Sequence, residues 1–158
     1  MAANGFQHVL QYAFVDDRGN VVLSAYGAAA SPVACGPQEP AEPMPVDPLD
    51  PGTLEYILSR ICNGANLVTF GRVLQVGMLP PASAMGAETV DCAWRRFLKL
   101  GRQRQVAFDR HQPLTLSDAL ASAGLAPVQS EDAVMRALAV RDLWTWMDGV
   151  ELGHGRVW

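Results

Sequence analysis

The sequence is short of cysteine and of long apolar runs, and each shortage excludes a class of protein. Its cysteines, Cys35, Cys62 and Cys92, are odd in number, far apart and without a CxxC pair, so neither a disulfide framework nor a zinc site is expected. We expect instead three reduced, mostly buried thiols of a cytoplasmic protein. No apolar run approaches the ~20 residues of a membrane helix, and the first residues lack the basic n-region of a signal peptide.

The residues that are present indicate one globular domain with a tail. The chain has 158 residues, of which 49% are hydrophobic and only 18% charged, and this balance suits a packed core. We expect a single domain over residues 1–150 and a short C-terminal tail over residues 151–158. Seven of the eleven prolines fall in residues 31–52. They predict an extended surface loop within the domain, and their PxxP spacing leaves polyproline recognition open.

The hydrophobic pattern changes between strand and helix periods along the chain. Two runs of strand formers, HVLQYAFV and VVLSAY, flank the turn sequence DDRGN and predict a β-hairpin. Thr53 is the predicted cap of the first helix. The predicted strands are residues 8–15, 21–26, 66–70 and 88–92, and the predicted helices are residues 51–62, 73–79, 92–100, 115–123 and 130–147. This order describes an α/β domain with a mixed sheet flanked by helices.

Positive charge is concentrated in one short segment. The chain carries a net charge of −4, yet six of its twelve basic residues lie within residues 94–110 beside a single acid. On an otherwise acidic protein this segment predicts a phosphate-contacting patch, and a solvated helix face and loop is the alternative. Trp94, at its start, either packs in the core or stacks a nucleic-acid base. The candidate nucleic-acid-binding residues are Arg95, Arg96, Lys99, Arg102, Arg104 and Arg110.

The order of the segments resembles a known enzyme family. HVLQYAFVDDRGNVVLSAYGAAASP is similar to two successive strands of that family, NLVTFGRVLQVGML to a strand, turn and helix, and SEDAVMRALAVRDLW to its final helix. ETVDCAWRRFLKL and LTLSDALASAGL are similar to the segments between them. Through these five segments, over most of the chain, the sequence resembles the proofreading 3′–5′ exonucleases, typified by the epsilon subunit of DNA polymerase III. The resemblance implies a ribonuclease H-like fold with a mixed sheet.

The resemblance also implies where the catalytic acids of the family would fall, and the sequence lacks them there. The family holds two metal ions with four carboxylates. Its first motif, Asp-x-Glu, has no counterpart, because only residues 1–7 precede the hairpin and they contain no acid. The sequence therefore offers no counterpart for the strand that carries this first motif in the family. The second motif has Gln75 in place of its aspartate, and the third has Arg136, a cation, at the metal position. The degenerate motif positions are Phe70, Gly71, Gln75, Glu131 and Arg136, and neither a metal nor a cofactor is predicted.

Arg136 has two interpretations under this resemblance. In one, it pairs with Gln75 or Glu131 inside a former metal cleft. In the other, its fixed positive charge takes the place of the metal and holds a phosphate without cutting it.

Three functions fit these patterns, in descending order. The first is a pseudoenzyme, a catalytically inactive exonuclease-like protein that binds nucleic acid, single strands included, or a nucleic-acid-processing complex. The second is a protein-interaction module or homodimer that uses the fold as a scaffold. The third is an active metal-dependent exonuclease with acids from other positions, such as Asp16, Asp91 and Asp132. It ranks last because two-metal chemistry needs carboxylates that converge on one point. The sequence does not decide between DNA and RNA.

Overall fold

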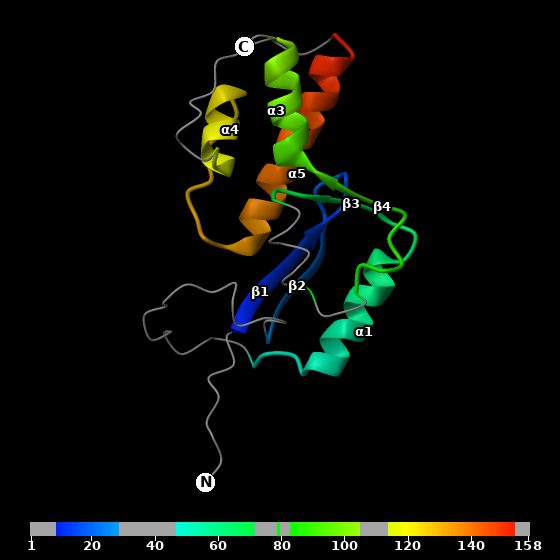
Figure 1. Ribbon diagram of the computed structural model, residues 1–158. Helices are drawn as coiled ribbons and strands as arrows, with labels where there is room; N and C mark the ends of the chain where they lie inside the picture. The colour runs from blue at the N-terminus through cyan, green and yellow to red at the C-terminus, as the bar shows by residue number, and fades with distance from the viewer. Residues whose placement is uncertain (1–8, 29–46, 72–78, 80–82, 105–113, 154–158) are drawn as a thin grey trace.

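The mixed α/β class predicted from the sequence is confirmed. The computed structural model describes residues 9–28, 47–71, 79, 83–104 and 114–153, and these form four helices and two two-stranded sheets (Figure 1). No helix within these ranges is long and apolar enough to span a membrane. The strands are β1 (Val9–Val15), β2 (Val21–Ala28), β3 (Asn66–Thr69) and β4 (Thr89–Cys92), and the helices are α1 (Pro51–Cys62), α3 (Ala93–Gln103), α4 (Leu116–Ser122) and α5 (Ala133–Glu151).

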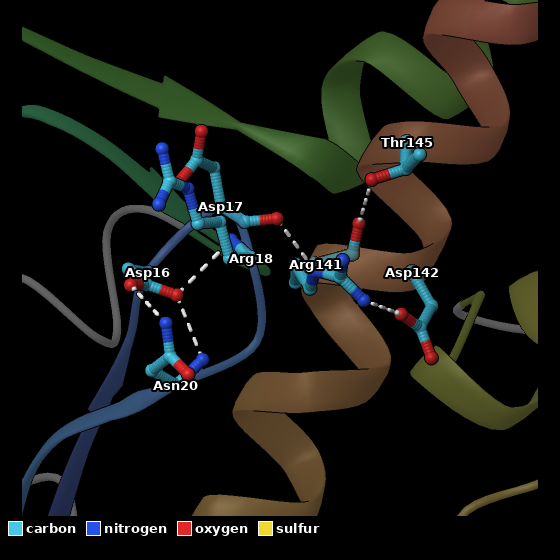
Figure 2. A network of polar contacts seen from close by, with 7 residues as sticks. All are labelled: Asp16, Asp17, Arg18, Asn20, Arg141, Asp142 and Thr145. Carbon is cyan, nitrogen blue, oxygen red and sulfur yellow. Dashed lines mark hydrogen bonds and ion pairs between the residues drawn. The ribbon is translucent and has the colours of Figure 1, made fainter.

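β1 and β2 form the antiparallel hairpin that the sequence predicts. Asp16 organises its turn, because its carboxylate accepts hydrogen bonds from the Asn20 side chain and from the backbone N–H groups of Asn20 and Arg18 (Figure 2). These bonds, the one from the Asn20 side chain first, lower the pKa of Asp16. Gly19 has a φ of +88°, a left-handed conformation that glycine adopts without steric cost.

Helix α5 is tied to this hairpin at two places. At its start, Gln11 of β1 donates to the Asp132 carboxylate at 3.0 Å and accepts from the backbone N–H of Ala133 at 2.9 Å. Further along, Arg141 donates from Nε to the carbonyl oxygen of Asp17 in the turn at 2.9 Å (Figure 2). The two contacts together align the helix with the hairpin.

The hairpin lies between α1 and α5. Successive side chains of a strand point to opposite faces of a sheet. Tyr12 packs with Leu54 and Leu58 of α1, whereas Gln11, its neighbour in sequence, reaches α5. Gly27 permits the close approach of α1, because a Cβ at this position would lie 2.5 Å from Cδ2 of Leu54. One face of the hairpin is therefore covered by α1 and the other by α5.

A second and larger core lies where α3, α4 and α5 meet (Figure 1). Phe97 is fully buried in it, and its ring centroid lies 6.1 Å from that of Trp146. Strand β3 joins the same core through Val68, and Phe70 follows. The buried residues of this core are Ala93, Phe97, Leu100, Leu116, Ala119, Leu120, Ala139, Val140, Leu143 and Met147.

The sheet arrangement differs from the prediction. The sequence predicts residues 9–15, 21–26 and 66–70 in one mixed sheet. Among the described residues, β1 pairs with β2 in one sheet, and β3 pairs in parallel with β4 in another. Helix α5 contacts strands of both sheets. Residues 73–78 of the helix predicted over residues 73–79, and most of the proline-rich segment, lie outside the described residues.

The structure corrects the predicted cap of α1 and defines the starts of α4 and α5. The cap of α1 is Asp50, not Thr53, because Pro51 occupies the first helical position and the Asp50 carboxylate accepts from the Thr53 N–H. Helix α4 begins after Thr115, which forms a reciprocal capping box with Asp118. Helix α5 begins after Asp132, whose carboxylate accepts from the backbone N–H groups of Val134 and Met135, so the helix starts three residues later than the predicted range 130–147. In each case the true cap is the residue whose side-chain oxygen reaches the N–H groups of the first turn.

Candidate nucleic-acid interface

The basic segment begins on α3, and the packing of this helix separates its two faces. Ala93, Phe97, Leu100 and Gly101 are buried, at the three- and four-residue spacing of an inward helix face. Of the basic residues between them, Arg95 and Lys99 are exposed, whereas Arg96 is partly buried. Consecutive basic residues of the segment therefore have different surroundings.

The side chain of Arg96 is paired with acidic residues of α5. Its Nη2 atom lies 2.6 Å from the Asp148 carboxylate and 2.5 Å from that of Glu151, and its side chain is only 18% exposed. Its guanidinium lies over the Trp144 ring, 4.2 Å from the centroid. Burial alone would lower the pKa of Arg96, but the hydrogen bonds to Glu151 and Asp148 outweigh it and raise the pKa. Arg96 thus works as a structural clamp between two helices.

Arg104 is also used inside the protein. It is the C-cap residue of α3, and its Nη2 donates to the carbonyl oxygen of Val150 at 3.0 Å. The Val150 carbonyl also accepts from the backbone N–H of Gly153, so Arg104 adds a second hydrogen bond at the C-terminal end of α5. Arg110, the last of the six candidates, lies outside the described residues.

The side chains of Arg95, Lys99 and Arg102 are not used in this way among the described residues. They are exposed, and none forms a hydrogen bond or ion pair at contact distance with another described residue, although the charge of Lys99 helps to lower the pKa of Glu151 after the larger effect of Arg96. With Trp94 and Leu98 they line a shallow hollow of about 280 Å³. We call these five residues the outer face of α3. Leu98 was not singled out by the sequence, although its four-residue spacing from Trp94 places the two side chains together.

The start of α3 adds a weak positive potential to this face. Cys92 precedes the helix and its side chain makes no capping hydrogen bond, and the first turn contains no acid. The helices α1, α4 and α5, in contrast, each begin with a side-chain cap. Because the helix dipole is positive at its N-terminus, the first turn of α3 favours an anion in the same sense as the three cations.

The structure describes four of the five positions matched to the exonuclease motifs. Phe70 packs against the larger core after β3, and Gly71 follows it with a φ of +91°. Glu131 and Arg136 lie at the start of α5, where Oε2 of Glu131 is 3.3 Å from Nη1 of Arg136. Their side chains are 98% and 48% exposed, so this is a surface ion pair. Gln75 lies outside the described residues.

The three acids of the active-exonuclease alternative serve three separate local structures. Asp16 holds the hairpin turn, Asp91 of β4 accepts a hydrogen bond from Thr89, and Asp132 caps α5. The hydrogen bond from Gln11 is the largest cause that lowers the pKa of Asp132. Within the part of the chain that the structure describes, no group of three His, Cys, Asp or Glu side chains is placed to hold a metal ion.

Comparison with protein-family models, with curated proteins and with solved structures finds no match to this chain.

Proposed function

We propose that this protein binds nucleic acid through the outer face of α3 and does not cut it. The observation that carries the proposal is the separation of charge on this helix. Arg96 and Arg104 are used within the protein, while Arg95, Lys99 and Arg102 stand together beside Trp94. Three uncommitted cations on one helix face form a local attraction for phosphate on a chain whose net charge is −4.

The non-cutting half of the proposal rests on the resemblance to the exonuclease family and on the placement of its acids. The resemblance implies a ribonuclease H-like scaffold whose metal positions carry an amide and a guanidinium. The acids that remain elsewhere, Asp16, Asp91 and Asp132, are used to hold a turn, a strand and a helix start. A protein of this composition keeps the surface of a nucleic-acid enzyme without its two-metal chemistry.

Binding is tested by titrating a short fluorescent oligonucleotide, as DNA and as RNA, at several salt concentrations. Each phosphate contact on a single strand contributes about −0.7 to the slope of log affinity against log salt, so three contacts give about −2. Replacing Arg95→Ala and Arg102→Ala together should make that slope shallower by about 1.4 and weaken binding to all sequences alike.

The matched control is the pair Arg18→Ala and Arg60→Ala, which removes the same charge from exposed positions on the hairpin turn and α1. This control should leave the slope unchanged. A flat titration at about 50 mM salt, where the electrostatic contribution is strong, would refute the binding proposal and favour the protein-interaction alternative.

Cutting is tested separately with the same oligonucleotides. Clean protein with Mg²⁺ or Mn²⁺ should leave both strands intact. Progressive shortening from the 3′ end that EDTA abolishes, and that a Gln75 or Arg136 substitution alters, would show that the assignment of the motif positions is wrong.

A further inference from the structure

We infer that the ligand of this face is an unpaired polynucleotide strand, one base of which stacks on Trp94. This inference rests on the proposed function and adds the class of nucleic acid and the residue that selects it. The indole of Trp94 is not part of the buried core. Trp94 lies half-buried on the first turn of α3, in the wall of the hollow.

The neighbours of Trp94 suit a stacking role. Leu98, one turn later on the same side of the helix, lines the hollow with it, and side chains four residues apart on a helix are neighbours. The large apolar residues of α3, such as Phe97 and Leu100, are already used by the core. Trp94 therefore offers an aromatic surface beside the cations, which is the combination that holds bases and phosphates of a single strand.

The cations form a line that leads away from Trp94. Along the helix axis, Arg95 lies next to Trp94, Lys99 about 6 Å further and Arg102 about 10 Å beyond Arg95, at 1.5 Å per residue. A strand whose base rests on Trp94 places its following phosphates along this line. A duplex would present phosphates to the same cations, but its bases are stacked inside it and cannot reach the indole.

The shape of the hollow argues against a free nucleotide. All five of its lining residues come from one helix, so among the described residues it has a floor and no facing wall. Its volume of about 280 Å³ lies just below the 300–1,000 Å³ of pockets that enclose small molecules. An open track of this kind suits a polymer, whose affinity is the sum of several weak contacts.

An anionic membrane surface is the other polyanion that a basic face with a tryptophan can meet. A helix that lies in a membrane interface buries a continuous apolar face in the lipid. The apolar face of α3 is buried in the protein core instead, and only Trp94 and Leu98 remain beside the cations. The face is therefore better suited to stacking single bases than to entering lipid.

The first experiment compares a normal single strand with an abasic strand of equal length, so that the phosphate charge is the same and only the bases are missing. The abasic strand should bind the wild-type protein roughly 5- to 150-fold more weakly, which corresponds to the usual contribution of one stacked base. Equal affinity for the two strands would overturn the inference, and this comparison needs no variant protein.

The second experiment uses substitutions of Trp94. Trp94→Ala should weaken binding of the normal strand by the same roughly 5- to 150-fold factor, leave the salt slope unchanged and have little effect on a duplex of the same sequence. Trp94→Phe should restore most of the affinity. Tyr56→Ala, which removes an exposed aromatic ring from α1, is the matched control and should have no effect.

The outcomes separate the two proposals. If the strand binds with the expected salt slope but Trp94→Ala changes nothing, the stacking inference fails and the proposed function stands. If no strand binds at low salt, both fail. Tighter binding to phosphatidylserine-containing vesicles than to the strand, at equal salt, would overturn the inference in favour of a membrane surface.

Discussion

The two faces of α3 differ in what holds their residues in place. On the inner side, Phe97 is fully buried and Arg96 is clamped between two carboxylates and an indole. On the outer side, Arg95 and Arg102 are exposed. Residues that neighbour each other in sequence therefore have different surroundings: the inner ones contribute to folding, and the outer ones are those that we propose to contact a ligand. The comparison predicts that substitutions on the two faces have separable effects.

The largest loss of stability is expected from Phe97→Ala. The ring fills the core between α3, α4 and α5 and lies against Trp146, so its removal should lower the free energy of unfolding by about 3–5 kcal/mol. Denaturant unfolding measures this loss. Lys99→Ala, two residues further on the outer face, is the control and should change stability by less than about 0.5 kcal/mol. A similar loss from both substitutions would remove the distinction between the faces.

A smaller loss is expected from Arg96→Ala. The substitution removes two charged hydrogen bonds and the contact with Trp144, and because the two carboxylates it abandons are half-exposed, we expect about 1–3 kcal/mol. Arg96→Lys should recover only part of this, since an ammonium lacks the planar fork of a guanidinium. The salt slope of nucleic-acid binding should stay the same in both variants. A slope that becomes shallower would place Arg96 in the interface.

The pH dependence of the free energy of unfolding tests the contribution of the Arg96–Glu151 ion pair to the inner side of α3. The hydrogen bond from Arg96 is the first cause that lowers the pKa of Glu151 in the folded protein. A carboxylate with a lowered folded pKa stabilises the protein above its unfolded pKa, and this contribution is lost as the pH falls through the folded value. Stability should therefore decline below about pH 4, and Glu151→Gln should decline less. Identical pH profiles would show that the ion pair contributes nothing to folding.

The smallest effect on stability is expected from Arg95→Ala combined with Arg102→Ala. Both side chains are exposed, and exposed charges rarely contribute more than about 0.5 kcal/mol each. The double variant should unfold at the same denaturant concentration as the wild type while its binding weakens. If the double variant unfolds at a markedly lower denaturant concentration, Arg95 and Arg102 have structural partners, and the outer face of α3 contributes to folding as the inner face does.

The sequence predicts local structure well where side chains and turn residues act within a few positions. The DDRGN turn defines the hairpin because Asp16 and Asn20 bond each other directly. The apolar stripe of residues 130–147 predicts helix α5, but the helix continues to Glu151 rather than ending at Met147. The tertiary contacts of its last turn, from Arg96 to Glu151 and from Arg104 to Val150, stabilise it past the glycine at position 149.

The candidate site was only half predictable, for a physical reason. The cluster of basic residues is visible in the sequence, but the partners that commit Arg96 lie 52 and 55 residues away on α5. No local pattern connects them. The spacing of Ala93, Phe97 and Leu100 is typical of the inward face of a helix. Once these three residues are known to face the core, the same spacing places Arg95, Lys99 and Arg102 on the outer face. The pairing of β3 with β4 apart from the hairpin depends in the same way on distant contacts.

The bond between Gln11 and the start of α5 also has a consequence for synthesis on the ribosome. Its two sides are separated by 121 and 122 residues. At about 5–20 residues per second, the hairpin emerges roughly 6–24 s before the helix that covers one of its faces. During that interval the nascent hairpin exposes apolar side chains and is a substrate for chaperones and proteases. A chain truncated before residue 133 lacks α5. Its hairpin face should therefore stay uncovered and remain a substrate for chaperones and proteases.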